Sequence, residues 1–158
     1  MLHVPFEDDK KYVMFKKENI QTIIFDWGGV CCSEGEPFAS SALQNAVGLG
    51  PNEIAKEVKD IYLDYYRGTY HAETFWQAVL AHFSLPMNAF EFSSRELTAA
   101  YLSSYTVWND VLDAAKKLSE HYSVGLLSDL TYEMKEQIRS AHNLDTIFPF
   151  QMYSCDVG

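Results

Sequence analysis

Two polar turns stand out in this sequence because each directly follows a short apolar segment. Asp26 follows the apolar residues 23–25 and precedes two glycines, whereas Ser128 and Asp129 follow the apolar segment 123–127. A carboxylate held at a strand end beside glycines can act as a nucleophile or as a metal ligand. A serine hydroxyl ahead of a helix offers donors to an anion. Together the two turns predict a phosphate site.

Each turn also has a purely structural interpretation. An aspartate before glycine is a common turn residue, and a serine before a helix is a common cap. The functional interpretation therefore depends on the pair. In an open parallel sheet, ligands bind beyond the carboxyl ends of the strands, which is where both turns are expected to lie.

The elements that would position these residues belong to an α/β fold. Apolar runs predict strands over residues 21–25, 123–127 and 150–153, and the first two are of the kind buried on both faces. A helix over residues 109–121, with Asn109 as its N-cap, and a second helix containing Met134 and Ile138 alternate with the strands. This order predicts a parallel sheet. A further short strand is predicted over residues 11–15.

A long helical segment separates the first strand from the others. Apolar residues recur at helical spacing in four stretches, 37–47, 51–66, 72–83 and 94–104. The many aromatic residues in these stretches favour core packing over substrate stacking. The chain is accordingly divided into an α/β core (18–32 and 106–158), a helical insertion (33–105) and an N-terminal extension (1–17).

Composition restricts the partners and the compartment. The 158 residues include 22 acidic and 12 basic side chains, for a formal charge of −10. This balance argues against nucleic acid and against an anionic membrane surface as partners. No apolar run reaches the ~18–20 residues of a membrane span, and Met1 to Glu7 lack a secretory pattern, so we expect a cytoplasmic protein. Cys31, Cys32 and Cys155 are expected to be small buried hydrophobes.

The two turns resemble sequence motifs of a known superfamily. Residues 23–30, Ile-Ile-Phe-Asp-Trp-Gly-Gly-Val, are similar to motif I of the haloacid dehalogenase-like (HAD) hydrolases, and residues 126–129, Leu-Leu-Ser-Asp, are similar to motif II. Residues 67–76 resemble a segment in the helical cap of the subgroup that contains sugar-phosphate phosphatases. The resemblance implies a partial Rossmann-like parallel sheet with an inserted helical cap.

The same resemblance implies a phosphatase mechanism. Asp26 would attack a phosphate monoester and form an aspartyl-phosphate. Mg²⁺ would be held by the Asp26 carboxylate and the Gly28 carbonyl, while Ser128 and the Asp129 backbone N–H would bind the phosphate oxygens. The expected partner is a small phosphorylated metabolite, over which the helical cap would close.

The sequence also departs from the family pattern. Gly28 occupies the position where many family phosphatases have an acid–base aspartate. The lysine of motif III and the acidic residues of motif IV are absent from the chain. We therefore expect a C-terminally truncated member with little or no activity. An open sheet edge at the first strand is expected to favour self-association.

Three alternatives remain open at the level of sequence. The first is a non-catalytic relative that binds phosphate or a protein. The second is a phosphonate-cleaving or haloacid-cleaving branch, in which Lys56 or Lys59 of the insertion could supply a Schiff-base lysine. The third is an unrelated flavodoxin-like module.

Overall fold

The structure, a computed structural model, describes residues 20–87 and 93–158. Their centre is a parallel sheet of three strands in the order β1-β2-β3, whose bounds are Thr22–Phe25, Ser123–Ser128 and Phe150–Tyr153. Phe25 lies opposite Leu126, and Ser128 lies opposite Tyr153. This arrangement confirms the predicted α/β fold. The strand predicted over residues 11–15 lies outside the described residues.

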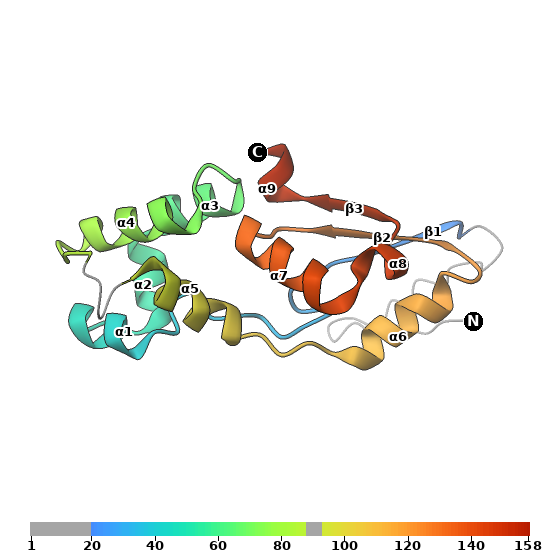
Figure 1. Cartoon of the computed structure of the whole chain (residues 1–158), viewed down its shortest axis with the longest axis horizontal. Helices are drawn as coiled ribbons and strands as arrows, with labels where there is room; N and C mark the ends of the chain where they lie inside the picture. Colours follow the sequence, from blue (N-terminus) through green and yellow to red (C-terminus); the bar gives the residue numbers. More distant parts are fainter. Residues whose placement is uncertain (1–19, 88–92) are drawn as a thin grey trace, which may run out of the picture.

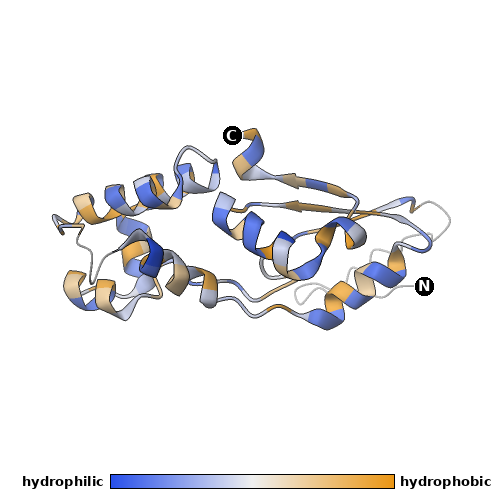
Figure 2. Ribbon diagram, viewed as in Figure 1, coloured by the Kyte–Doolittle hydropathy of each residue, from blue (hydrophilic) through white to orange (hydrophobic). Residues whose placement is uncertain are grey.

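One face of the sheet is covered by helices α6 (Asn109–Leu118), α7 (Tyr132–His142) and α8 (Leu144–Ile147), which lie on the same side of the strands (Figure 1). Alternate residues of β2, Val124 and Leu126, are buried beneath them. Hydrophobic residues run along the strands, whereas the helices alternate hydrophobic and hydrophilic turns (Figure 2). The hydrophobic core therefore lies between this face and its three helices.

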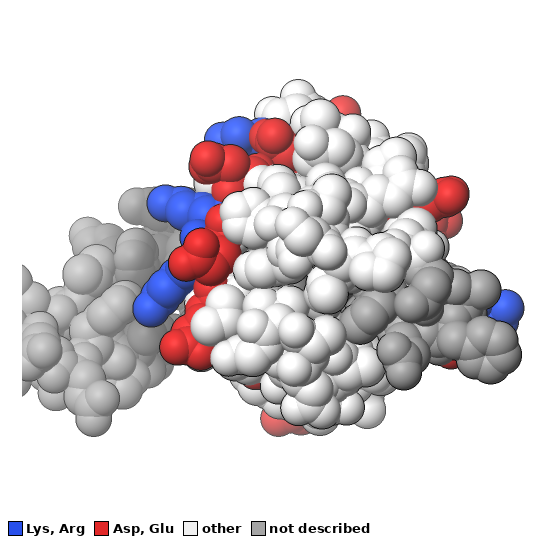
Figure 3. Space-filling model, turned by 90° about the vertical axis from the view of Figure 1, so that its left-hand side faces the viewer, with Lys and Arg blue, Asp and Glu red and all other residues white. Residues whose placement is uncertain are grey.

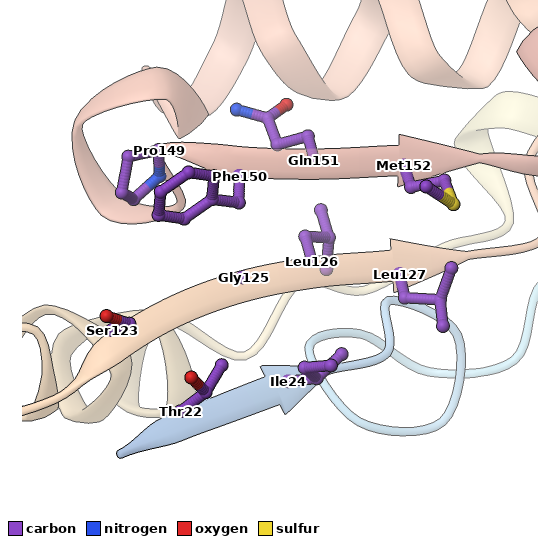
Figure 4. A pocket seen from close by; sticks show the side chains of 10 residues that line it. All are labelled: Thr22, Ile24, Ser123, Gly125, Leu126, Leu127, Pro149, Phe150, Gln151 and Met152. Carbon is purple, nitrogen blue, oxygen red and sulfur yellow. The ribbon is translucent and has the colours of Figure 1, made fainter.

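The opposite face of the sheet is open in the described residues. Ile24, Leu127, Phe150 and Met152 are between 51% and 67% exposed there, around a shallow apolar groove of about 700 Å³ (Figure 4). The prediction that β1 and β2 are buried on both faces is therefore wrong for the described residues. The physical reason is that both crossover helices, α6 and α7, pack on the same side.

In the described residues between β1 and α6, five helices form a separate group at the other end of the molecule, which we call the insert (Figure 1). They are α1 (Ser41–Val47), α2 (Pro51–Glu57), α3 (Lys59–Tyr66), α4 (Ala72–His82) and α5 (Ser94–Ser103). The stripe predicted over residues 51–66 is broken at Val58, whose φ of −106° and ψ of 26° end α2. Both halves still bury their apolar residues, Ile54 and Tyr65, so the break serves the packing of the insert.

The chain enters and leaves the insert through two segments that run side by side. Ser33 N–H donates to Thr106 O at 2.8 Å, and Trp108 N–H donates to Cys31 O at 2.9 Å. Trp108 is the N-cap of α6, and the predicted N-cap Asn109 is instead the first residue of the helix. The α7 N-cap is Thr131, whose hydroxyl accepts from Met134 N–H at 3.3 Å.

Charged side chains are unevenly spread over the end of the insert. Figure 3 shows Lys and Arg lying among Asp and Glu along one side, while most of the remaining face is uncharged. Among the helices of residues 20–87 and 93–158, none is long and apolar enough to cross a lipid bilayer.

Candidate functional site

The Asp26 side chain lies at the carboxyl end of β1, beside the end of β2. Its Oδ1 accepts hydrogen bonds from Ser128 Oγ at 2.6 Å and from Trp27 N–H at 2.6 Å. The Trp27 N–H also approaches Ser128 Oγ at 3.3 Å. Because Phe25 pairs with Leu126, the parallel register brings the ends of the two strands together. The structure thus places two of the predicted site residues in direct contact.

The turn after Asp26 is anchored by Trp27, whose side chain is buried. The carbonyl oxygen of Trp27 accepts from the backbone N–H groups of Val30, Cys31 and Cys32 at 3.3, 2.8 and 3.1 Å. Gly29 has a φ of +70°, a conformation that glycine adopts without strain. Gly28 sits beside open space, since a Cβ built there would meet no atom within 4 Å.

The adjacent cysteines of this turn are poor candidates for a nucleophile. Cys31 and Cys32 are buried and free, as is Cys155, which confirms their predicted role as small hydrophobes. Burial, together with the nearby Cys32 and Asp26, raises the pKa of Cys31 to about 12. Burial and Asp26 raise the pKa of Cys32 to about 11. Both thiols therefore stay protonated at neutral pH.

Asp26 opens into a cleft of about 630 Å³ between the sheet and the insert. One side, which we call the sheet wall, carries Asp26, Ser128, Asp129 and Ser154. The other side, which we call the insert wall, carries Leu63, Tyr66 and Arg67 at the end of α3. The cleft therefore combines hydroxyl groups and carboxylates from the strand ends with a guanidinium from the insert.

Several contacts attach the insert to the α/β core beside the insert wall, among them the hydrogen bonds of two core side chains and one close backbone approach. Ser154 Oγ donates to Tyr66 O at 2.7 Å. Gly68, with a φ of +78°, lies so close to the core that an added Cβ would stand 2.3 Å from Cys155 O. A further contact involves the Glu133 carboxylate, which accepts from Tyr65 Oη and from the first N–H of α4, on Ala72, both at 2.8 Å.

A smaller cavity of about 210 Å³ adjoins the cleft beside Gly28. Tyr62, Tyr66 and Tyr105 line it, and their hydroxyl groups join with that of Tyr101 in one hydrogen-bonded chain with steps of 3.0, 2.6 and 2.8 Å. Burial raises the pKa of all four tyrosines well above the ordinary value of 10.0. Their hydroxyls are therefore proton donors rather than bases at neutral pH.

Several residues singled out from the sequence lie elsewhere. Lys56 and Lys59 line a separate cavity with His82, away from Asp26, so their placement gives no support to a Schiff base at this site. Sequence reasoning missed Ser154 and Arg67 as cleft residues. The only available signal was their position: Arg67 begins the segment that resembles a cap motif, and Ser154 follows the last strand.

The sheet wall supplies few ligands for a metal ion. Among the described residues, no group of three or more His, Cys, Asp or Glu side chains could hold one. Mg²⁺ nevertheless binds in many proteins through only one or two carboxylates and keeps several waters. The Asp26 carboxylate and the Gly28 carbonyl are hard oxygen donors of this type. The residues present therefore fit a hydrated Mg²⁺.

Solved structures share this fold. A HAD family enzyme from Bacteroides thetaiotaomicron, crystallised with magnesium, has a TM-score of 0.70 and 18% sequence identity over 87% of this chain and 69% of its own. Its wild-type complex with magnesium and inorganic phosphate has a TM-score of 0.67 and 19% identity over 88% and 71%. A predicted HAD-like family hydrolase from Porphyromonas gingivalis has a TM-score of 0.66 and 22% identity over 87% and 67%.

No family model and no curated protein matches the sequence. At these identities the structural similarities show the fold, and the chemistry has to be argued from the residues of the cleft.

Proposed function

Because the chain has the HAD-like fold, we propose that it hydrolyses a small phosphate monoester, with Asp26 as the nucleophile. The observation that carries the proposal is the Asp26 carboxylate, held at the end of β1 by Ser128 Oγ at 2.6 Å in a cleft that the insert also lines. One enzyme of the same fold was crystallised with magnesium and inorganic phosphate, which supports this class of substrate.

The proposed reaction has two steps on Asp26. A carboxylate oxygen attacks phosphorus, the P–O bond to the alcohol breaks, and the departing alkoxide takes a proton from water. Water then attacks the aspartyl-phosphate, which releases inorganic phosphate and restores the carboxylate. Trp27 N–H, which binds Oδ1 in the structure, holds the carboxylate in one orientation for the attack.

A magnesium ion would be held by the Asp26 carboxylate and the Gly28 carbonyl. When bound, Mg²⁺ neutralises charge on the phosphoryl oxygens. Ser128 and the Asp129 backbone N–H are the proposed phosphate-binding groups of this chain. To bind phosphate, the Ser128 hydroxyl must exchange its bond to Asp26 for one to a phosphate oxygen.

We propose that the insert acts as a cap. This proposal is supported by the insert wall, which lines the cleft opposite Asp26, and by the bonds of Tyr65 to Glu133 and of Tyr66 O to Ser154. Closure excludes bulk water from the phosphoryl group and lets the insert choose the alcohol part of the substrate. The proposed boundaries of the cap are residues 33 and 105, close to the paired segments at Ser33 and Thr106.

The decisive experiment traps the proposed nucleophile. Beryllofluoride, a mimic of the phosphoryl group, is added with Mg²⁺, and fluorine NMR records the species bound to the protein. We expect a bound signal in the wild-type chain and none in Asp26→Asn. The matched control is Asp129→Asn, the same substitution at the other carboxylate of the sheet wall, which should retain the signal because its proposed contact is a backbone N–H.

Turnover of p-nitrophenyl phosphate with Mg²⁺ completes the test. Gly28→Asp places an acid where a side chain meets open space, so we expect it to raise turnover by about tenfold or more, within the range for general acid catalysis. A trapped signal that survives in Asp26→Asn would overturn the nucleophile. Phosphate binding with no trapped species would favour the non-catalytic alternative.

A further inference from the structure

The charges of the cleft are divided between its two walls. The sheet wall carries the carboxylates of Asp26 and Asp129. Within the described residues that line the cleft, Arg67 of the insert wall is the one basic side chain. An anionic ligand therefore meets a complementary charge on the insert side.

Arg67 is well positioned for this contact. It caps the C-terminus of α3, where its backbone N–H donates to Leu63 O at 3.0 Å, and a cation is favoured at that end of a helix. The neighbouring backbone is tied to the core, since Tyr66 O accepts from Ser154 Oγ and Gly68 abuts Cys155 O. The backbone of Arg67 is thus held at the junction between the two walls.

The guanidinium itself is available to a ligand. Its recorded partner is Asp64, with Nη1 and Oδ1 3.3 Å apart, and the two side chains are 59% and 40% exposed. Such an exposed pair on one helix contributes little stability, so a ligand can replace it at small cost. The planar fork of an arginine matches a carboxylate or a phosphate, to which it can donate two hydrogen bonds.

The part of a ligand that reaches Arg67 follows from the geometry. A phosphoryl group bound against Asp26 and Ser128 lies on the sheet wall, so the alcohol part of the ester faces the insert wall. Resting on the proposed function, we propose that Arg67 binds a second anionic group, such as a carboxylate, on the alcohol part of the substrate. The preferred substrates are then phosphate monoesters of hydroxy acids rather than of neutral alcohols.

Binding measurements test this without turnover. Titration calorimetry in the presence of Mg²⁺ compares 2-carboxyethyl phosphate with propyl phosphate, which differ by a carboxylate in place of a methyl group. We expect the wild-type chain to bind the first about five- to tenfold more tightly, the gain for a partly exposed charged hydrogen bond. Arg67→Gln should remove that preference and leave the affinity for propyl phosphate unchanged, whereas Arg67→Lys should keep part of it.

The control is Arg95→Gln, on α5 and outside the lining of the cleft, which should preserve the preference. Equal affinity of the wild-type chain for both ligands would overturn the inference while leaving the proposed phosphate site intact. An equal loss of affinity for both ligands in Arg67→Gln would also overturn it, because Arg67 would then hold the phosphoryl group. Binding of neither ligand would instead count against the proposed function, and the inference would fail with it.

Discussion

The sheet wall and the insert wall of the cleft are held in place by different means. Asp26 and Ser128 stand one residue past β1 and at the end of β2, so the backbone pairing of the sheet sets their separation. Arg67 and Tyr66 stand at the end of a helix that belongs to the insert, and a few contacts with the core decide where they lie. The difference indicates that the position of Asp26 is fixed by the sheet, whereas the position of the insert wall can be changed by single substitutions.

Substitution of Gly68, which lies in close contact with the core, should have the largest effect on the free energy of unfolding. Gly68→Ala forces a side chain into a φ of +78° and against the backbone of Cys155, so we expect a loss of about 2–4 kcal/mol in the free energy of unfolding. Gly48→Ala is the matched control, because Gly48 has a φ of +73° with no neighbour within 4 Å, and only the strain of about 1–2 kcal/mol should appear. Urea denaturation measures the free energy of unfolding of both variants. Equal losses in Gly68→Ala and Gly48→Ala would contradict the close contact at Gly68.

Glu133 should have the next largest effect. Its side chain is 22% exposed and joins Tyr65 to the start of α4. Glu133→Ala removes two hydrogen bonds to a charged group, for an expected loss of about 1.5–3 kcal/mol. Hydrogen exchange should become faster in α3 but stay unchanged in β2. Glu136→Ala, at an exposed position of the same helix, should change stability by no more than about 0.5 kcal/mol. Equal exchange in both elements would show that the two walls move as one.

Alkaline pH should have the smallest effect on stability, and it acts through the tyrosines of the insert. Burial raises the pKa of Tyr66 and Tyr105 above their ordinary 10.0, so the unfolded chain loses these protons first. The contribution of these two tyrosines to the free energy of unfolding is fully present below pH 10 and declines as the pH rises further. We expect tyrosinate absorbance from Tyr66 and Tyr105 to appear only together with the change in tryptophan fluorescence that marks unfolding. Free titration of these tyrosines near pH 10, with unchanged fluorescence, would contradict their burial.

The same contrast explains what could be predicted from the sequence. The strands, their parallel order and the pairing of Asp26 with Ser128 follow from local apolar runs and from the rule that parallel strands end at one edge. The break at Val58 could not be predicted, because its side chain fits the apolar stripe and only packing within the insert turns the chain there. The placement of Arg67 in the cleft could not be predicted either. A basic residue at a helix end is usually solvated, and the position of Arg67 depends on Gly68 and Ser154.

The exposure of Ile24 was missed for a related reason. An apolar β-branched run indicates a strand that favours burial, and it says nothing about whether a helix covers the second face. Both crossover helices pack on one side of the sheet, which leaves Ile24 63% exposed in the structure.

The open apolar groove over Ile24, Leu127, Phe150 and Met152 bears on how the protein behaves during expression. Among the described residues nothing covers this apolar surface, and contiguous exposed apolar surface promotes the association of chains at high concentration. Phe150→Lys would place an ammonium group at a position that is exposed and lies outside the lining of the Asp26 cleft, without altering the backbone pairing of β2 with β3. That variant is therefore the form to prepare for crystallisation.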